Sequence, residues 1–113
     1  MNKIYQESLL YDFYGELLTK RQQEIFEHVK FEDLSLSEAA EEYGISRQGI
    51  HDLLRRSEET LQAYEDKLGL VAKFMETKEA AGRIRELCCR WEQDPNASVT
   101  AEIRALADKI ENL

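Results

Sequence analysis

The stretch SLSEAAEEYGISRQGIHDLLRRSEETL, residues 35–61, carries the start and stop signals of two helices in immediate succession. Ser35 and Glu38 match a capping box, in which each side chain satisfies the other residue's backbone amide. Gly44 can adopt the left-handed conformation that ends a helix, and Ser46 is a favourable N-cap. We therefore predict a short helix to residue 43, a turn at Gly44 and a second helix from Arg47.

The residues around this turn favour a helix-turn-helix. Ala39 and Ala40 are small and lie inside the first helix, where a second helix can approach closely. The side chains expected to share a core between the two helices are Tyr43, Ile45, Ile50 and Leu53. The outward face of the second helix would then carry Ser46, Arg47, Gln48, His51, Asp52 and Arg55.

In a DNA-reading helix-turn-helix this outward face meets the major groove. Arg47 and Gln48 carry donors that read guanine and adenine edges, and Arg55 and Arg56 can hold phosphate. The predicted nucleic-acid site is Ser46, Arg47, Gln48, His51, Arg55 and Arg56. The alternative is an ordinary solvated face on a three-helix module that reads no bases, in which an exposed histidine is incidental.

The charge of the chain opposes broad contact with nucleic acid. The whole chain has a formal charge of −8, and residues 19–68 hold 7 basic against 12 acidic side chains. Residues 46–57 alone carry a net +2, from three arginines against Asp52. Because affinity for nucleic acid comes largely from phosphate neutralisation, we expect DNA binding to be weak, salt-sensitive or dependent on two copies. A basic protein partner is the alternative that the acidic body favours.

The rest of the chain predicts an all-α fold. We expect a helix at residues 4–18 with one apolar stripe, a Thr19–Gln22 capping box, and a second helix that includes Ile25 and Phe26. The helix from Arg47 has no obvious stop before about residue 77, although Gly69 or Gly82 would permit a bend. Helices at residues 78–93 and after the break at 94–98 complete the chain. Their expected inner faces are Ala81, Ile84, Leu87, Cys88 and Trp91, and then Val99, Ile103, Leu106, Ile110 and Leu113.

Apolar residues spaced by three and four continue past the helix-turn-helix and form the seam Leu61, Tyr64, Leu68, Val71 and Met75. Such a seam is typical of a coiled coil, so we expect a homodimer. Packing inside one chain against residues 78–93 is the alternative. We accordingly divide the chain into a helix-turn-helix core, residues 1–60, and a helical dimerisation or interaction arm, residues 61–113.

The sequence lacks the residue patterns that several classes of function require. The only cysteines, Cys88 and Cys89, are adjacent, and we expect them to be small buried hydrophobes, with redox sensing as the alternative. No metal-ligand spacing, phosphate loop or paired nucleophile and base is present, so we expect neither catalysis nor a cofactor. No segment has the length and apolarity of a signal peptide or a membrane span, which predicts a cytoplasmic protein without membrane insertion.

Three segments within residues 12–68 resemble the YlxM family of small bacterial helix-turn-helix proteins. They are DFYGELLT, the L-S-L-x-E-x-A-E-E-x-x-x-S-R-Q segment and the R-x-E-x-x-L-x-x-Y-E-x-K-L segment. The same half is similar to region four of bacterial sigma factors, which binds promoter DNA. Gly49 and His51 depart from the family, which tends to have alanine and an aromatic residue there.

Genes of the YlxM family commonly neighbour those of the signal recognition particle. The resemblance therefore implies a nucleic-acid-binding regulatory protein associated with that pathway. The alternative is an accessory factor that binds the protein or RNA of the particle without reading DNA sequence.

Overall fold

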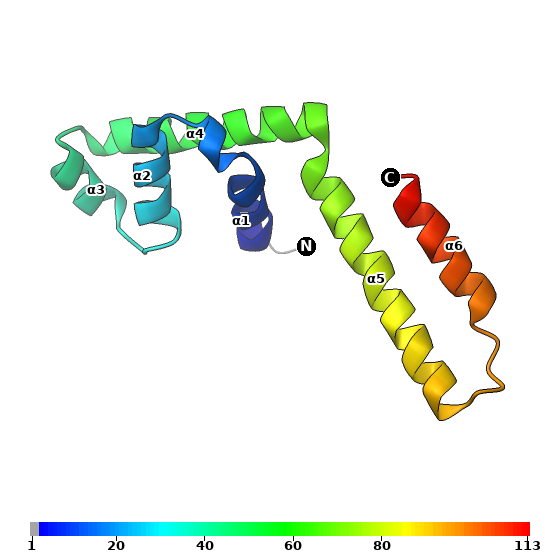
Figure 1. Ribbon diagram of the computed structural model, residues 1–113. Helices are drawn as coiled ribbons and strands as arrows, with labels where there is room; N and C mark the ends of the chain where they lie inside the picture. The colour runs from blue at the N-terminus through cyan, green and yellow to red at the C-terminus, as the bar shows by residue number, and fades with distance from the viewer. Residues whose placement is uncertain (1–2) are drawn as a thin grey trace. The chain divides into compact units, whose positions relative to one another are not determined.

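Residues 3–113, which the computed structural model describes, are all-α, as predicted (Figure 1). The elements are α1 (Lys3–Tyr14), the 3₁₀ turn η1 (Gly15–Leu17), α2 (Lys20–Lys30), α3 (Leu36–Tyr43), α4 (Arg47–Leu68), α5 (Leu70–Gln93) and α6 (Thr100–Glu111). They form two compact units, Met1–Gly69 and Leu70–Leu113, called here the N-terminal and C-terminal units. The boundary lies at the end of α4, whereas the sequence division after residue 60 falls inside that helix.

The capping signals of the N-terminal unit are confirmed. Thr19 and Gln22 form a capping box at the start of α2, and Ser35 and Glu38 form another at the start of α3. The Oγ of Ser46 accepts from the Gly49 amide, 2.9 Å away, at the start of α4. These contacts satisfy amides that would otherwise lack partners in the first turn of each helix.

The first predicted helix, residues 4–18, is correct only as far as Tyr14. The chain then tightens into η1, and the Gln23 side-chain amide donates to the carbonyls of Gly15 (2.9 Å) and Leu18 (3.1 Å). The single apolar stripe is wrong in part, because Ile4 is 71% and Leu17 54% exposed. The change from α to 3₁₀ geometry leaves Leu17 exposed, while Leu18 is buried in the core.

The core of the N-terminal unit is aromatic and aliphatic. Its buried members are Leu9, Tyr14, Leu18, Ile25, Phe26, Ala39, Ile50, Leu54 and Leu61. Tyr11 stacks on Phe26 with ring centroids 4.9 Å apart, and the Tyr14 hydroxyl donates to Glu65 at 2.6 Å. Fully burying one large apolar side chain stabilises a fold by about 1.5–3 kcal/mol. The buried side chains of this unit therefore stabilise the packing of α4 against the other helices.

The sequence shows no obvious stop between residue 47 and about 77 but permits a bend at Gly69 or Gly82, and the structure has a stop at the first of these. Gly69 adopts the left-handed conformation (φ 64°, ψ 24°) and ends α4, while α5 runs without a break through Gly82. The predicted seam is therefore shared between two helices and is not one exposed stripe, since Leu61 and Val71 are both buried. Glycine permits a left-handed cap but does not require one, so the sequence alone left the choice between Gly69 and Gly82 open.

In the C-terminal unit α5 and α6 lie side by side, joined by residues 94–99 (Figure 1). The predicted inner face of α5 is right at Leu87 but wrong at Ala81, which is exposed. Cys88 and Trp91 line a groove with Val99 and Ile103, beside α6, but are themselves exposed. The stripe instead passes through Ala80 and Leu87, two turns apart on one side of the helix. Cys88 and Cys89 are free and exposed, so the prediction that they are buried is also wrong.

Candidate nucleic-acid interface

The turn between α3 and α4 has the geometry that the sequence predicts. Gly44 ends α3 with φ 66° and ψ 32°, a left-handed conformation that costs glycine little. The Ile45 amide then donates to the Ala40 carbonyl at 3.1 Å, which fastens the turn to α3. Ala39 and Ile50 are fully buried, one on each helix, so the inner side of α4 is fixed in the core.

The six predicted site residues lie together at the N-cap and in the first three turns of α4. Ser46, Arg47, Gln48, His51, Arg55 and Arg56 are all exposed. The side chains of His51 and Arg55 are 59% and 56% accessible. The structure therefore leaves the outer side of this helix accessible to solvent.

Asp52 occupies the middle of this face and contacts three of its members. Its Oδ1 accepts from Gln48 Nε2 at 3.0 Å, and lies 3.7 Å from a guanidinium nitrogen of Arg55 and 3.8 Å from His51 Nδ1. Among the described residues, neither Arg47 nor Arg56 forms an ion pair. The two ends of the face thus carry free positive charge, while its centre is neutralised by a carboxylate.

This organising role of Asp52 is absent from the sequence-based site. Gln48 and Arg55 stand four residues before and three residues after it, and side chains at these spacings are neighbours on a helix. The spacing therefore contained the signal that would have found the network.

A groove of about 400 Å³ runs beside the same face, between the start of α2 and the first turns of α4. It is lined by Thr19, Gln22, Gly49, Asp52, Leu53 and Arg56. The first turn of α2 holds Lys20 and Arg21, both exposed, which the sequence-based site did not include. A helix N-terminus with basic residues favours phosphate, so this border extends the positive part of the face.

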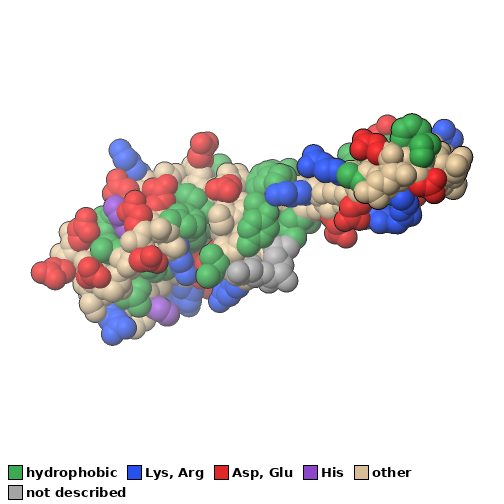
Figure 2. Space-filling view, turned by 90° about the horizontal axis from the view of Figure 1, so that it is seen from below, with side chains coloured by type: hydrophobic (Ala, Val, Ile, Leu, Met, Phe, Trp, Pro, Cys, Tyr) green, Lys and Arg blue, Asp and Glu red, His purple; other side chains and the backbone are tan. Residues whose placement is uncertain are grey.

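The N-terminal unit as a whole is acidic. In Figure 2 acidic side chains are spread over much of the visible face of the N-terminal unit. Over residues 1–69 there are 8 basic and 15 acidic side chains, a net charge of −7. A polyanion would therefore meet a locally positive segment on a unit whose net charge is negative.

The short helix α3, the left-handed turn at Gly44 and the exposed outer side of the longer helix α4 define a helix-turn-helix protein. The chain belongs to the UPF0122 family, described as "Putative helix-turn-helix protein, YlxM / p13 like", which matches residues 1–99. A UPF0122 protein of Desulforamulus reducens is 46% identical over 110 residues, covering 97% of this chain and 94% of its own length. The UPF0122 protein YlxM of Bacillus subtilis is 37% identical over 113 residues, covering all of this chain and 97% of its own. The resemblance drawn from the sequence is thereby confirmed.

Two further observations concern the described residues. None of their helices combines the length and the apolarity that crossing a bilayer requires. Nor do three or more histidine, cysteine, aspartate or glutamate side chains gather there as ligands for a metal ion.

Proposed function

We propose that the N-terminal unit binds double-stranded DNA, with α4 in the major groove and Arg47 and Gln48 toward base edges. The observation that carries this proposal is the exposed cluster from Ser46 to Arg56, anchored from behind by the buried Ile50 and Leu54. In proteins of this class the second helix of the motif reads bases with residues near its N-terminus. His51, Arg55 and Arg56 would then lie toward phosphates further along the helix.

Binding of this kind should be weak and steeply dependent on salt, because the net charge of residues 1–69 is −7. Asp52 adds to this limit, since its carboxylate competes with DNA for Gln48 and Arg55. On this proposal the protein acts in the cytoplasm as a regulator whose contacts with nucleic acid are selective and readily reversed.

The test is fluorescence anisotropy with labelled duplexes at several salt concentrations. Arg47→Ala should lower affinity by roughly tenfold, as loss of one bidentate base contact is worth about 1–3 kcal/mol. Arg85→Ala is the matched control, an exposed arginine of α5 outside the motif, and should leave affinity unchanged. Equal losses in the two variants would reject α4 as the reading element.

Self-association belongs to the same proposal, since two half-sites one turn apart would add the affinity that one copy lacks. We infer that the C-terminal unit pairs two copies as a homodimer. Its buried residues are few (Val71, Ala80, Leu87 and Val99), and Leu70, Phe74 and Trp91 are exposed. Light scattering after size-exclusion chromatography, with and without duplex, tests it; a monomer under both conditions would reject it.

The second candidate is an accessory factor of the signal recognition particle that binds its protein or RNA and reads no DNA. The acidity of residues 1–69 favours it, because a basic ribonucleoprotein component complements a net charge of −7. Titration of purified particle protein and RNA against the same chain separates the two functions. Binding to the particle alone, unaffected by Arg47→Ala, would support this second function over the first.

A further inference from the structure

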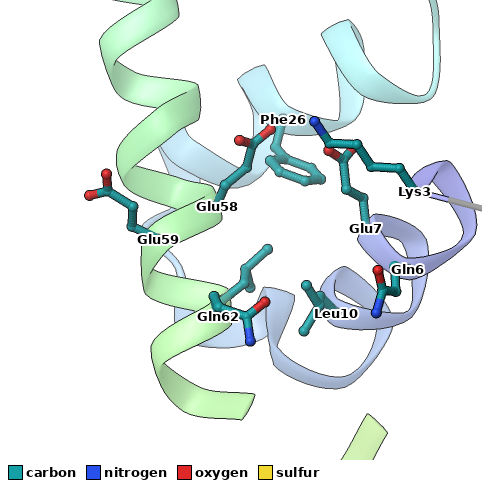
Figure 3. Close-up of a pocket in the computed structure, with 9 residues that line it drawn as sticks. Lys3, Gln6, Glu7, Leu10, Phe26, Glu58, Glu59 and Gln62 are labelled. Atoms are coloured by element: carbon teal, nitrogen blue, oxygen red, sulfur yellow. The ribbon is translucent and has the colours of Figure 1, made fainter. Parts of the chain in front are cut away.

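A second concave site lies in the N-terminal unit, between α1, α2 and α4, and is called here the α1–α4 pocket (Figure 3). It has a volume of about 280 Å³. Its floor is apolar and consists of Leu10, Phe26 and Leu61. Its rim consists of Lys3, Gln6 and Glu7 on α1 and Glu58, Glu59 and Gln62 on α4.

The walls of the pocket are fixed by contacts behind and across it. Phe26 and Leu61 are 0% and 1% exposed, and Tyr11 stacks on the Phe26 ring. The Lys30 ammonium lies 2.7 Å from Glu58 and 3.7 Å from Glu7, so it joins α4 to α1. Burial lowers the pKa of Lys30, but the Glu58 and Glu7 carboxylates more than offset this and raise it above its usual value. The pocket is therefore preformed, which reduces the entropy lost on binding.

The rim is negative on the α4 side. Along α4 the charge reverses after Arg56: residues 57–68 hold Glu58, Glu59, Glu65 and Asp66 against Lys67, a net −3. Glu58 is paired with Lys30, whereas Glu59 is exposed and forms no ion pair among the described residues. An occupant that brings lysine or arginine to this rim would gain both charge complementarity and the apolar floor.

We propose that the α1–α4 pocket receives one bulky apolar side chain from a lysine- and arginine-rich segment of another protein. The volume suits a single leucine, methionine or phenylalanine, and the flanking cations would lie over Glu59 and its neighbours. A second N-terminal unit is disfavoured as the occupant, because it carries the same net −7. Nucleic acid is disfavoured for the same reason. The site is separate from the DNA-facing residues and does not rest on their function.

The experiment uses the full chain and a fluorescein-labelled synthetic peptide of lysine and alanine with one central phenylalanine. A second peptide replaces the phenylalanine with alanine and keeps the charge. Anisotropy should show that the first peptide binds about tenfold or more tightly than the second, as burial of an aromatic anchor is worth at least 1.4 kcal/mol. Equal affinities would overturn the proposal, because only diffuse charge would then be acting.

Paired variants locate the binding. Gln62→Trp fills the mouth of the pocket and should abolish the preference for phenylalanine, whereas Ala63→Trp, at the next and exposed position of α4, should keep it. Glu59→Lys should weaken binding several-fold more than Glu41→Lys on α3, because the two variants change the net charge by the same amount and differ only in position. Circular dichroism checks that each variant is folded. Loss of the preference in Ala63→Trp as well, or equal losses in the two lysine variants, would place the peptide elsewhere.

Discussion

The two units of this chain are both helical, but they are stabilised in different ways. The N-terminal unit buries Tyr14, Ile25 and Phe26 in a core that several helices share, and three of its helices begin with a side-chain cap. In the C-terminal unit the four buried residues include no aromatic one, and the N-cap of α6, Val99, makes no side-chain hydrogen bond. The first arrangement fixes the inner side of α4 in a shared core, whereas the second leaves Leu70, Phe74 and Trp91 40%, 38% and 49% exposed.

Charge separates the units as well. Residues 1–69 have a net −7, while residues 70–113 hold 7 basic and 8 acidic side chains. The ion pair between α5 and α6 joins Arg83 Nε to Glu102 at 2.7 Å, at an exposed position where its net contribution is small. The near-neutral unit is thus the one in which two copies can meet without strong repulsion.

The largest expected effect comes from Phe26→Ala in the core of the N-terminal unit. Removing a fully buried ring that stacks on Tyr11 should cost about 3–5 kcal/mol of unfolding free energy. All five tyrosines lie in residues 1–69 and the single tryptophan, Trp91, lies in α5. The unfolding transition followed by near-ultraviolet tyrosine absorption should therefore move to lower urea. The transition followed by Trp91 fluorescence should keep its urea midpoint.

Leu87→Ala is the reciprocal variant, because Leu87 is 1% exposed in the C-terminal unit. It should move the Trp91 transition and leave the tyrosine signal in place. If both probes shift together in both variants, the units unfold as one cooperative body and the contrast drawn between them fails.

The same substitution at two glycines should have opposite signs in the two units. Gly44→Ala forces a side chain into the left-handed turn (φ 66°) and should destabilise the N-terminal unit by about 1–2 kcal/mol. Gly82→Ala lies inside α5 with open space around the added methyl, and should stabilise the C-terminal unit by about 1 kcal/mol. Urea titrations followed by the two probes measure both, and a loss on Gly82→Ala would mean that a partner packs against that position.

Caps provide the next test. Ser46→Ala removes the acceptor of the Gly49 amide and should cost about 1 kcal/mol in the tyrosine-monitored transition. Ser98→Ala is the control, since Ser98 is exposed and caps no helix in the structure. A cost at Ser98 equal to that at Ser46 would show that the contrast in capping between the units is not energetic.

The parts of the fold that the sequence predicts correctly are those set by local chemistry. The Ser35–Glu38 capping box, Gly44 and Ser46 act within a few residues of themselves, so their side chains determine the backbone directly. The all-α class and the exposure of Arg47, Gln48 and Arg55 follow from those signals together with the buried Ile50. Their role in binding DNA stays a prediction.

The errors occur where a second helix decides the outcome. Cys88 belongs to an apolar series in sequence, yet α6 covers the stripe through Leu87 and leaves Cys88 exposed. The sequence around Gly69 and Gly82 permits a helix end at either residue, but only Gly69 ends a helix. The α1–α4 pocket is lined by residues from three helices, so no local sequence pattern predicts it. Tertiary packing selects among options that local sequence leaves equal.

The smallest expected effect is on the pH dependence of the tyrosine cluster. Burial, with the neighbouring Glu27 carboxylate, raises the pKa of Tyr11 from 10.0 to about 12. The folded state then favours the protonated phenol, so this stabilisation is complete below pH 10 and is lost as the pH rises toward 12. Urea titrations across this range should show a steeper loss of stability in the native chain than in Tyr11→Phe. Identical slopes would mean that Tyr11 ionises as freely as an exposed tyrosine and that the ring stack does not exclude water.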